Sequence, residues 1–123
     1  MSADLAALIE LAEDAGITRV YKAGSVPNSP ALPYAVISLD SGQRKSTRVG
    51  GWSPNLRRRF VVQMFGSTHD SVLATAAKAD EAFYDQRLTT VTGSPFSWRE
   101  LATPPARDPD ASGVMYALHT YRI

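Results

Sequence analysis

The sequence contains no cysteine, which excludes a disulfide framework, a zinc–thiolate site and a thiol nucleophile. This absence fits a reducing cytoplasm. No apolar stretch approaches the roughly 20 residues that a membrane-spanning helix needs. The first segment, residues 1–14, is acidic and lacks the basic start of a signal peptide. We therefore expect no association with a membrane.

An excess of charge of one sign is also missing, because 13 Lys and Arg face 12 Asp and Glu for a formal net charge of +1. A balance this even does not favour a protein that binds nucleic acid over its whole surface. The chain has 123 residues, of which 44% are hydrophobic. This length and composition predict one domain, residues 1–123, with its own core.

Two segments have the periodicity of amphipathic helices. The first begins with Ser2 as N-cap and ends at Gly16, where a C-cap glycine belongs. The second begins at Ser67 or Thr68 and should end near Gln86. The expected apolar faces consist of Leu5, Leu8, Ile9 and Ala12 in the first helix and Val72, Leu73, Ala76, Ala79 and Phe83 in the second.

Several other segments are typical of strands, and proline-rich loops lie at residues 24–33 and 103–113. The expected strands are residues 17–23, 34–39, 56–65, 88–91, 96–101 and 114–123. The segments 34–39 and 56–65 should pair as an antiparallel hairpin with a long connection. The predicted fold class is α+β, a mostly antiparallel sheet with two helices packed on one face and a long protruding β-hairpin. The other face would be partly open, or closed by another subunit.

A search for catalytic chemistry finds none. His69 and His119 lie far apart and lack clustered carboxylates, so we expect no metal site. The adjacent residues His69, Asp70 and Ser71 point in different directions on a helix, which is the wrong geometry for a hydrolase triad. The Gly50-Gly51 pair lacks the Lys-Ser/Thr of a phosphate-binding loop. The sequence predicts no enzyme activity and no cofactor.

The unusual feature is a basic cluster between residues 44 and 59, which contains no acid. Its members are Arg44, Lys45, Arg48, Arg57, Arg58 and Arg59. The rest of the chain then has seven basic against 12 acidic residues. Such asymmetry indicates an electrostatic contact surface. Trp52, within the same hairpin, is an apolar anchor of the kind enriched at protein interfaces.

Three interpretations of this hairpin remain open. It docks on an acidic surface of a neighbouring subunit, it contacts nucleic-acid phosphates, or it is solvated. Arg57 and Arg59 would share one face of a strand and Arg58 the other, which divides any phosphate-binding stripe. For docking, the candidate partners are acids expected on solvated helix faces. These are Glu10, Glu13 and Asp14 in the first helix and Asp80 and Glu81 on the outer side of the second.

The layout of the chain resembles the tail terminator (tail completion) proteins of phages with long, non-contractile tails. The resemblance lies in the acidic first helix, the proline-rich lead into the strand at Pro30–Val36, and the long hairpin that ends in Arg59–Phe65. The helix from Ser67 to Gln86 and the closing strand Met115–Ile123 complete it. It covers nearly the whole chain and depends on layout more than on a sharp motif.

This resemblance implies an α+β fold and a virion protein made in the host cytoplasm that forms a six-fold ring. The ring would cap the tail tube and meet the head–tail connector or a head-completion protein. DNA would pass through it without specific recognition, so we expect the basic hairpin to point between subunits. Two alternatives remain, a head-completion or neck adaptor protein and a small nucleic-acid-binding module that uses the hairpin.

Overall fold

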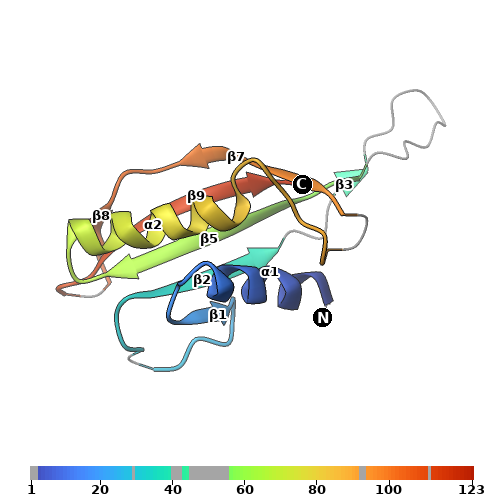
Figure 1. Cartoon of the computed structure of the whole chain (residues 1–123). Coiled ribbons are helices and arrows are strands. Elements are labelled where there is room, and N and C mark those ends of the chain that lie inside the picture. Colours follow the sequence, from blue (N-terminus) through green and yellow to red (C-terminus); the bar gives the residue numbers. More distant parts are fainter. Residues whose placement is uncertain (1–2, 29, 40–42, 45–55, 92–93, 111) are drawn as a thin grey trace.

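The computed structural model describes residues 3–28, 30–39, 43–44, 56–91, 94–110 and 112–123. Two helices, α1 (Ala3–Asp14) and α2 (His69–Phe83), accompany a set of strands (Figure 1). The strands are β1 (Val20–Lys22), β2 (Tyr34–Leu39), β3 (Gln43–Arg44), β4 (Leu56–Arg57), β5 (Arg59–Gly66), β6 (Gln86–Arg87), β7 (Phe96–Ala102), β8 (Ala106–Arg107) and β9 (Met115–Arg122). Within those ranges, neither helix is long and apolar enough to cross a membrane.

The main sheet has the order β1-β2-β5-β9-β7-β6, and β8 also pairs with β9. Its longest ladder joins β5 to β9, from Arg59 opposite Arg122 to Gly66 opposite Met115. The β2–β5 pair is antiparallel, as predicted, and only β1–β2 is parallel among the described pairs. The α+β fold class with a mostly antiparallel sheet is confirmed.

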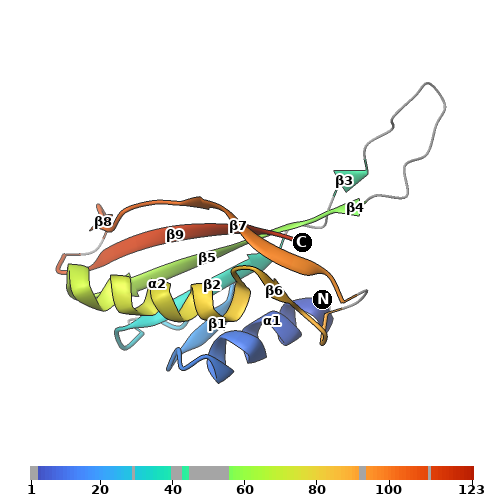
Figure 2. The ribbon, with the colours of Figure 1, turned by 45° about the horizontal axis from the view of Figure 1, so that its top comes forward.

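Both helices lie on one face of the sheet, where α1 contacts β1 and β2, and α2 contacts β5, β7 and β9 (Figure 2). Period-two alternation in β5 places Phe60, Val62 and Met64 on this face, and all three are fully buried. They pack with the apolar faces of both helices in one core. Leu73 is the exception to the expected face of α2, because it is 45% exposed and lies outside this core. Gly66 lets α2 approach β5, since an added Cβ would lie 2.9 Å from Ser71 Oγ.

The ends of the helices follow local capping chemistry. Thr68 is the N-cap of α2, and its hydroxyl accepts the Ser71 N–H at 3.1 Å. Gly16 follows α1 with φ +105°, a left-handed conformation that glycine adopts without strain. The end of α2 differs from the prediction near Gln86. The helix stops at Phe83, and Gln86 instead begins β6, which pairs with β7.

Three other expectations need correction. The segment 88–91 is not a strand but a turn, in which buried Leu88 and Val91 fill the core beside β6. The loop at 103–113 contains β8, because Ala106 and Arg107 pair with β9. The expected strand 56–65 is divided at Arg58, whose N–H and C=O pair with Ile123.

The base of the protruding hairpin is confirmed. Strands β3 and β4 form a separate two-stranded antiparallel sheet, with Gln43 opposite Arg57 and Arg44 opposite Leu56. They lie beyond the edge of the main sheet, at the end where β5 begins and β9 finishes (Figure 2). Lys45, Arg48 and Trp52 lie outside the described residues.

Candidate functional site

The structure separates the arginines of the basic cluster into different roles. Arg58 turns toward the helix-covered face, where its Nη1 lies 2.7 Å from Asp4 Oδ2. The exposed fractions of the two side chains are 18% and 12%. Arg59 points to the opposite face and pairs with Glu100 through Nε at 3.0 Å. Both arginines therefore hold parts of their own subunit together. For Arg44 and Arg57, the structure gives the backbone pairing of β3 and β4 alone.

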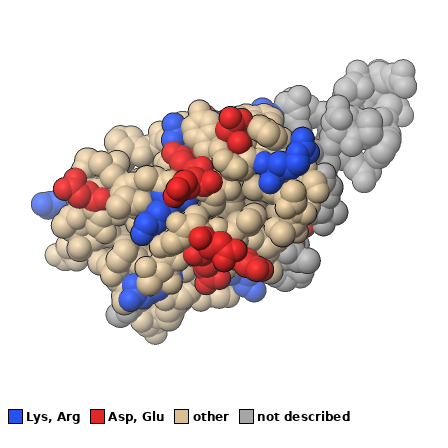
Figure 3. All heavy atoms as spheres, viewed as in Figure 1, with Lys and Arg blue, Asp and Glu red and all other residues tan. Residues whose placement is uncertain are grey.

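The candidate acids are also divided. Glu10, Glu13 and Asp14 are exposed on α1, and Figure 3 shows acidic side chains gathered over this helix. Glu81 is exposed on α2. Lys78 lies close to the end of α1, because its aliphatic chain is 3.7 Å from the position of a Cβ on Gly16. A cation there offsets the negative end of the helix dipole.

Asp80 was predicted on the solvated side of α2, and this placement is wrong. Its Oδ1 accepts the Tyr121 hydroxyl at 2.7 Å, and its Oδ2 lies 2.6 Å from Arg99 Nη1. The arginine also lies over the ring of Tyr84, with 4.9 Å between Cζ and the ring centroid. Asp80 thus joins α2 to β7 and β9 within the subunit, and its carboxylate is not available as an interface acid.

His119 extends this network below α2. Its Nδ1 lies 2.8 Å from the Tyr121 hydroxyl and 3.3 Å from Asp80 Oδ1. Since the hydroxyl donates to Asp80, the neutral imidazole donates its Nδ1 proton to Tyr121. Burial lowers the pKa of His119 despite the nearby carboxylate. Burial and the hydrogen bond to Asp80 raise the pKa of Tyr121.

This network is structural in its geometry. Asp80, Arg99 and Tyr121 satisfy one another, and none of them lines the two pockets found around β8 and the start of β9. A catalytic site would need such groups to open into a cavity. The described residues also contain no group of three or more His, Asp or Glu that could hold a metal ion.

The face of the sheet opposite the helices is covered by no described helix (Figure 2). Its apolar side chains are mostly half-buried, and they become more exposed toward β7 at the edge of the sheet. Exposed fractions reach 43% for Phe96, 43% for Trp98 and 57% for Leu101. Arg122 and Glu100, 3.5 Å apart, lie beside Trp98. We call Phe96, Trp98 and Leu101 the β7 patch.

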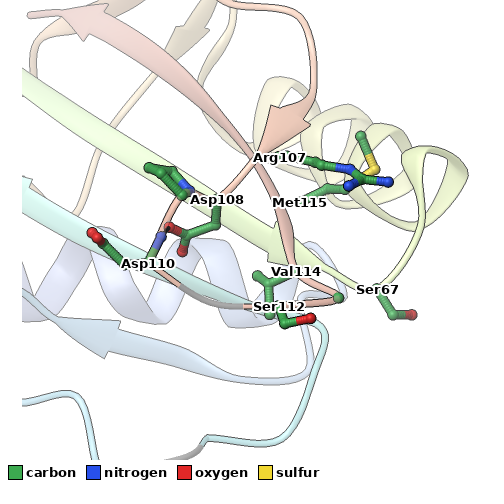
Figure 4. A pocket seen from close by; sticks show the side chains of 9 residues that line it. Ser67, Arg107, Asp108, Asp110, Ser112, Val114 and Met115 are labelled. Atoms are coloured by element: carbon green, nitrogen blue, oxygen red, sulfur yellow. Dashed lines mark hydrogen bonds between the residues drawn. The ribbon is translucent and has the colours of Figure 1, made fainter.

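Pockets form around the turn that joins β8 to β9. A cavity of about 570 Å³ is lined on one side by Arg107 and Met115 and on the other by Asp108 and Asp110 (Figure 4). A second cavity of about 280 Å³ shares the two aspartates and lies against Phe65 and Tyr116 of the open face. Sequence reasoning treated this segment as a loop and assigned no site to it.

Comparison with known protein families and with curated proteins finds no match for this chain. Comparison with solved structures finds a chain from a structure described as the virion of a native gene transfer agent particle. The two chains superpose with a TM-score of 0.58 and are 22% identical in sequence. The match covers 98% of this chain and 83% of the other, so the similarity of fold extends over the whole molecule.

Proposed function

We propose that this protein is a structural component of a phage-like virion, and more specifically a tail terminator. In that role it forms a ring, with six subunits expected, that caps the tail tube and joins it to the head connector. The fold supports the proposal, because a chain of a gene transfer agent virion shares it over 98% of this sequence. The layout that resembles tail terminators in sequence is independent support.

The observation that carries an assembly role is the exposed apolar surface of the sheet. Large side chains on the β7 patch are 43–57% exposed, on a face that no described helix covers. Aromatic residues exposed together in this way mark protein interfaces. Arg122 and Glu100 beside Trp98 give the surrounding polar rim.

The basic hairpin is the second part of the proposed interface. Arg44, Lys45, Arg48, Trp52 and Arg57 carry the contact between subunits, while Arg58 and Arg59 also support the root of the hairpin from within. Two groups of acids on a neighbouring subunit are candidates to receive these charges. One is Glu10, Glu13, Asp14 and Glu81, exposed on the helices, and the other is Asp108 and Asp110 in the turn after β8. Opposite charges fix orientation and register in such contacts.

The first experiment is native mass measurement across protein and salt concentration, with negative-stain images of the same sample. A closed ring, expected to contain six subunits, supports the terminator role, and its loss at high salt implicates the basic hairpin. The sample is then mixed with purified tail tubes, whose open end a terminator should cap.

A head-completion or neck adaptor protein would also need exposed surfaces for contact with other virion proteins. The protein that it binds distinguishes it from a tail terminator. An adaptor binds the connector and has no affinity for tail tubes. A nucleic-acid-binding module would instead show binding to DNA or RNA that weakens steeply with salt. A chain that binds neither tube nor connector contradicts both virion assignments.

A further inference from the structure

One end of the open sheet face carries a row of aromatic side chains. The rings of Tyr34 and Phe65 stack with centroids 4.7 Å apart, and Phe65 and Tyr116 follow at 6.2 Å. These residues are paired across β2, β5 and β9, and each is half-buried. Phe65 and Tyr116, with Gln63, form the floor of the 280 Å³ pocket. Two aromatic rings and one amide therefore make up this floor.

Two carboxylates form the rim of the same pocket. Asp108 and Asp110 belong to the turn after β8, and Asp108 Oδ1 accepts the Asp110 N–H at 2.9 Å. In Figure 4 the side chains of Asp108 and Asp110 lie on one side of the turn, and the Arg107 side chain points to the other. Burial and, next, the negative charge of Asp108 raise the pKa of Tyr34. The Tyr34 end of the aromatic row therefore lies within reach of the negative charge of Asp108.

An aromatic floor beneath a carboxylate rim suits a guanidinium group. Arginine stacks its planar group on an aromatic face and donates hydrogen bonds to carboxylates at its edge. Glu10, Glu13 and Asp14 offer only part of this environment. They are exposed on the outer surface of α1, away from the row of Tyr34, Phe65 and Tyr116.

The chain itself supplies a suitable occupant. Segment 44–57 contains Arg44, Lys45, Arg48 and Arg57 and no acid. Its root lies where β5 begins, at Arg59, whereas the pocket lies where β5 ends, at Phe65 and Gly66. Along an extended strand those ends are about 23 Å apart. Since β3 and β4 lead away from the sheet (Figure 2), the hairpin of a second copy is better placed to reach the pocket.

We propose that the pocket between Asp108, Asp110, Phe65 and Tyr116 receives the basic hairpin of a neighbouring copy of this chain. An arginine side chain lies on the aromatic floor and pairs with the two carboxylates. Because the root of the hairpin and the pocket lie at opposite ends of β5, the contact is head-to-tail, and such contacts close into rings when the rotation permits. The inference rests on the proposed ring and names its contact.

The test is a charge exchange between two variants of the full chain. The pocket variant carries Asp108→Lys and Asp110→Lys, and the hairpin variant carries Arg44→Glu, Lys45→Glu and Arg48→Glu. Alone, each variant brings like charges together, so self-association should weaken at least tenfold. Mixed in equal amounts, each hairpin meets a pocket of opposite charge, and sedimentation velocity and native mass should show restored, alternating assemblies.

Asp110→Lys alone is the milder pocket variant, because it leaves the Asp108 carboxylate that accepts the hydrogen bond in the turn. It should also weaken association, with an unchanged circular dichroism spectrum. The matched control is Glu10→Lys with Glu13→Lys, an equal change of charge on α1. Its association should stay within twofold of wild type, and a larger loss would place the hairpin on α1 and overturn the contact.

The other outcomes separate this contact from the proposed function. Pocket and hairpin variants that assemble like wild type overturn the contact and leave the ring standing. Folded variants that fail to complement each other when mixed overturn it as well. If the wild-type chain stays monomeric at every concentration, the contact between hairpin and pocket does not drive self-association, and the inference is wrong. The capping of tail tubes then tests the terminator role on its own.

Discussion

The hydroxyl of Tyr121 donates a 2.7 Å hydrogen bond to Asp80 Oδ1, and this bond ties the last strand to the second helix. Tyr121 is fully buried and packs between Phe60 and Phe83, with ring centroids 5.2 and 5.4 Å away. A polar group so deep in an aromatic core is stabilising only while its partner is present. Asp80 therefore sustains the packing of α2 against the sheet.

Replacing Asp80 should destabilise the chain strongly. Asp80→Ala leaves the Tyr121 hydroxyl without its acceptor and Arg99 without its counter-ion, and we expect a loss of about 2–4 kcal/mol in the free energy of unfolding. Urea denaturation followed by circular dichroism measures it. Glu81→Ala, the exposed neighbour, is the control and should change stability by no more than about 0.5 kcal/mol. If the two substitutions lowered the free energy of unfolding equally, Asp80 would not stabilise the fold through Tyr121 and Arg99.

Stability should fall as the pH falls below about 6.5, the ordinary pKa of histidine. Burial lowers the pKa of His119 in the folded chain, so the unfolded chain takes up the proton first. The free energy of unfolding therefore decreases as the pH drops below the unfolded pKa, and this decrease ends below the folded pKa. Chemical denaturation at a series of pH values should show a smaller decrease for His119→Gln.

The neighbouring arginines Arg58 and Arg59 should differ in their effect on stability. Arg58→Ala removes the largely buried pair with Asp4 and should cost about 1–3 kcal/mol. Arg59→Ala breaks a more exposed pair with Glu100, with side-chain exposures of 48% and 33%, and should cost about 0–1 kcal/mol. Thermal melts of the two variants at low protein concentration compare them directly. A larger loss for Arg59 would mean that the hairpin root is held mainly from the open face.

Polar substitutions in the β7 patch should weaken assembly without unfolding the subunit. Trp98→Lys and Leu101→Lys remove apolar area that is 43% and 57% exposed in the free chain. Burial of such area stabilises an interface by about 25 cal/mol per Å². The variants should therefore form smaller assemblies with a lower native mass, while their melting temperature stays nearly unchanged. The control is Leu73→Lys, which changes a side chain that is 45% exposed on α2. This variant should assemble as wild type if the open sheet face alone is the interface.

The pattern of apolar residues was enough to predict the fold class. In β5 and β9, period-two alternation separates two faces, and the structure buries the face that includes Ala117, His119 and Tyr121. The end of α2 was predicted three residues too late, because the helix propensities of Tyr84 and Gln86 do not exclude these residues from a helix. In the structure Gln86 instead pairs with Ser97 in the β6–β7 ladder, and this pairing places it in a strand. Such pairings depend on residues distant in sequence, which local propensity does not include.

Asp80 shows why the candidate acids were only partly identified. It lies four residues after Ala76 and three before Phe83, so it borders the buried stripe of α2 at helical spacing. That spacing was a usable signal. Its partners Arg99 and Tyr121 were beyond reach, because only the register of β7 with β9 brings them opposite each other. The pocket at Asp108 likewise required the turn to fold back against Phe65.

The position of β9 has a consequence for the order in which the molecule is made. Its residues are synthesised after every other described strand, yet β9 lies between β5 and β7. Until it emerges from the ribosome, the first half of the sheet and the β6–β7 pair have no strand to join them. The nascent chain then exposes an unpaired edge of β5, which is prone to aggregation. Completion of this sheet is thus a late event, and a shortage of chaperones during translation should lower the yield of folded protein.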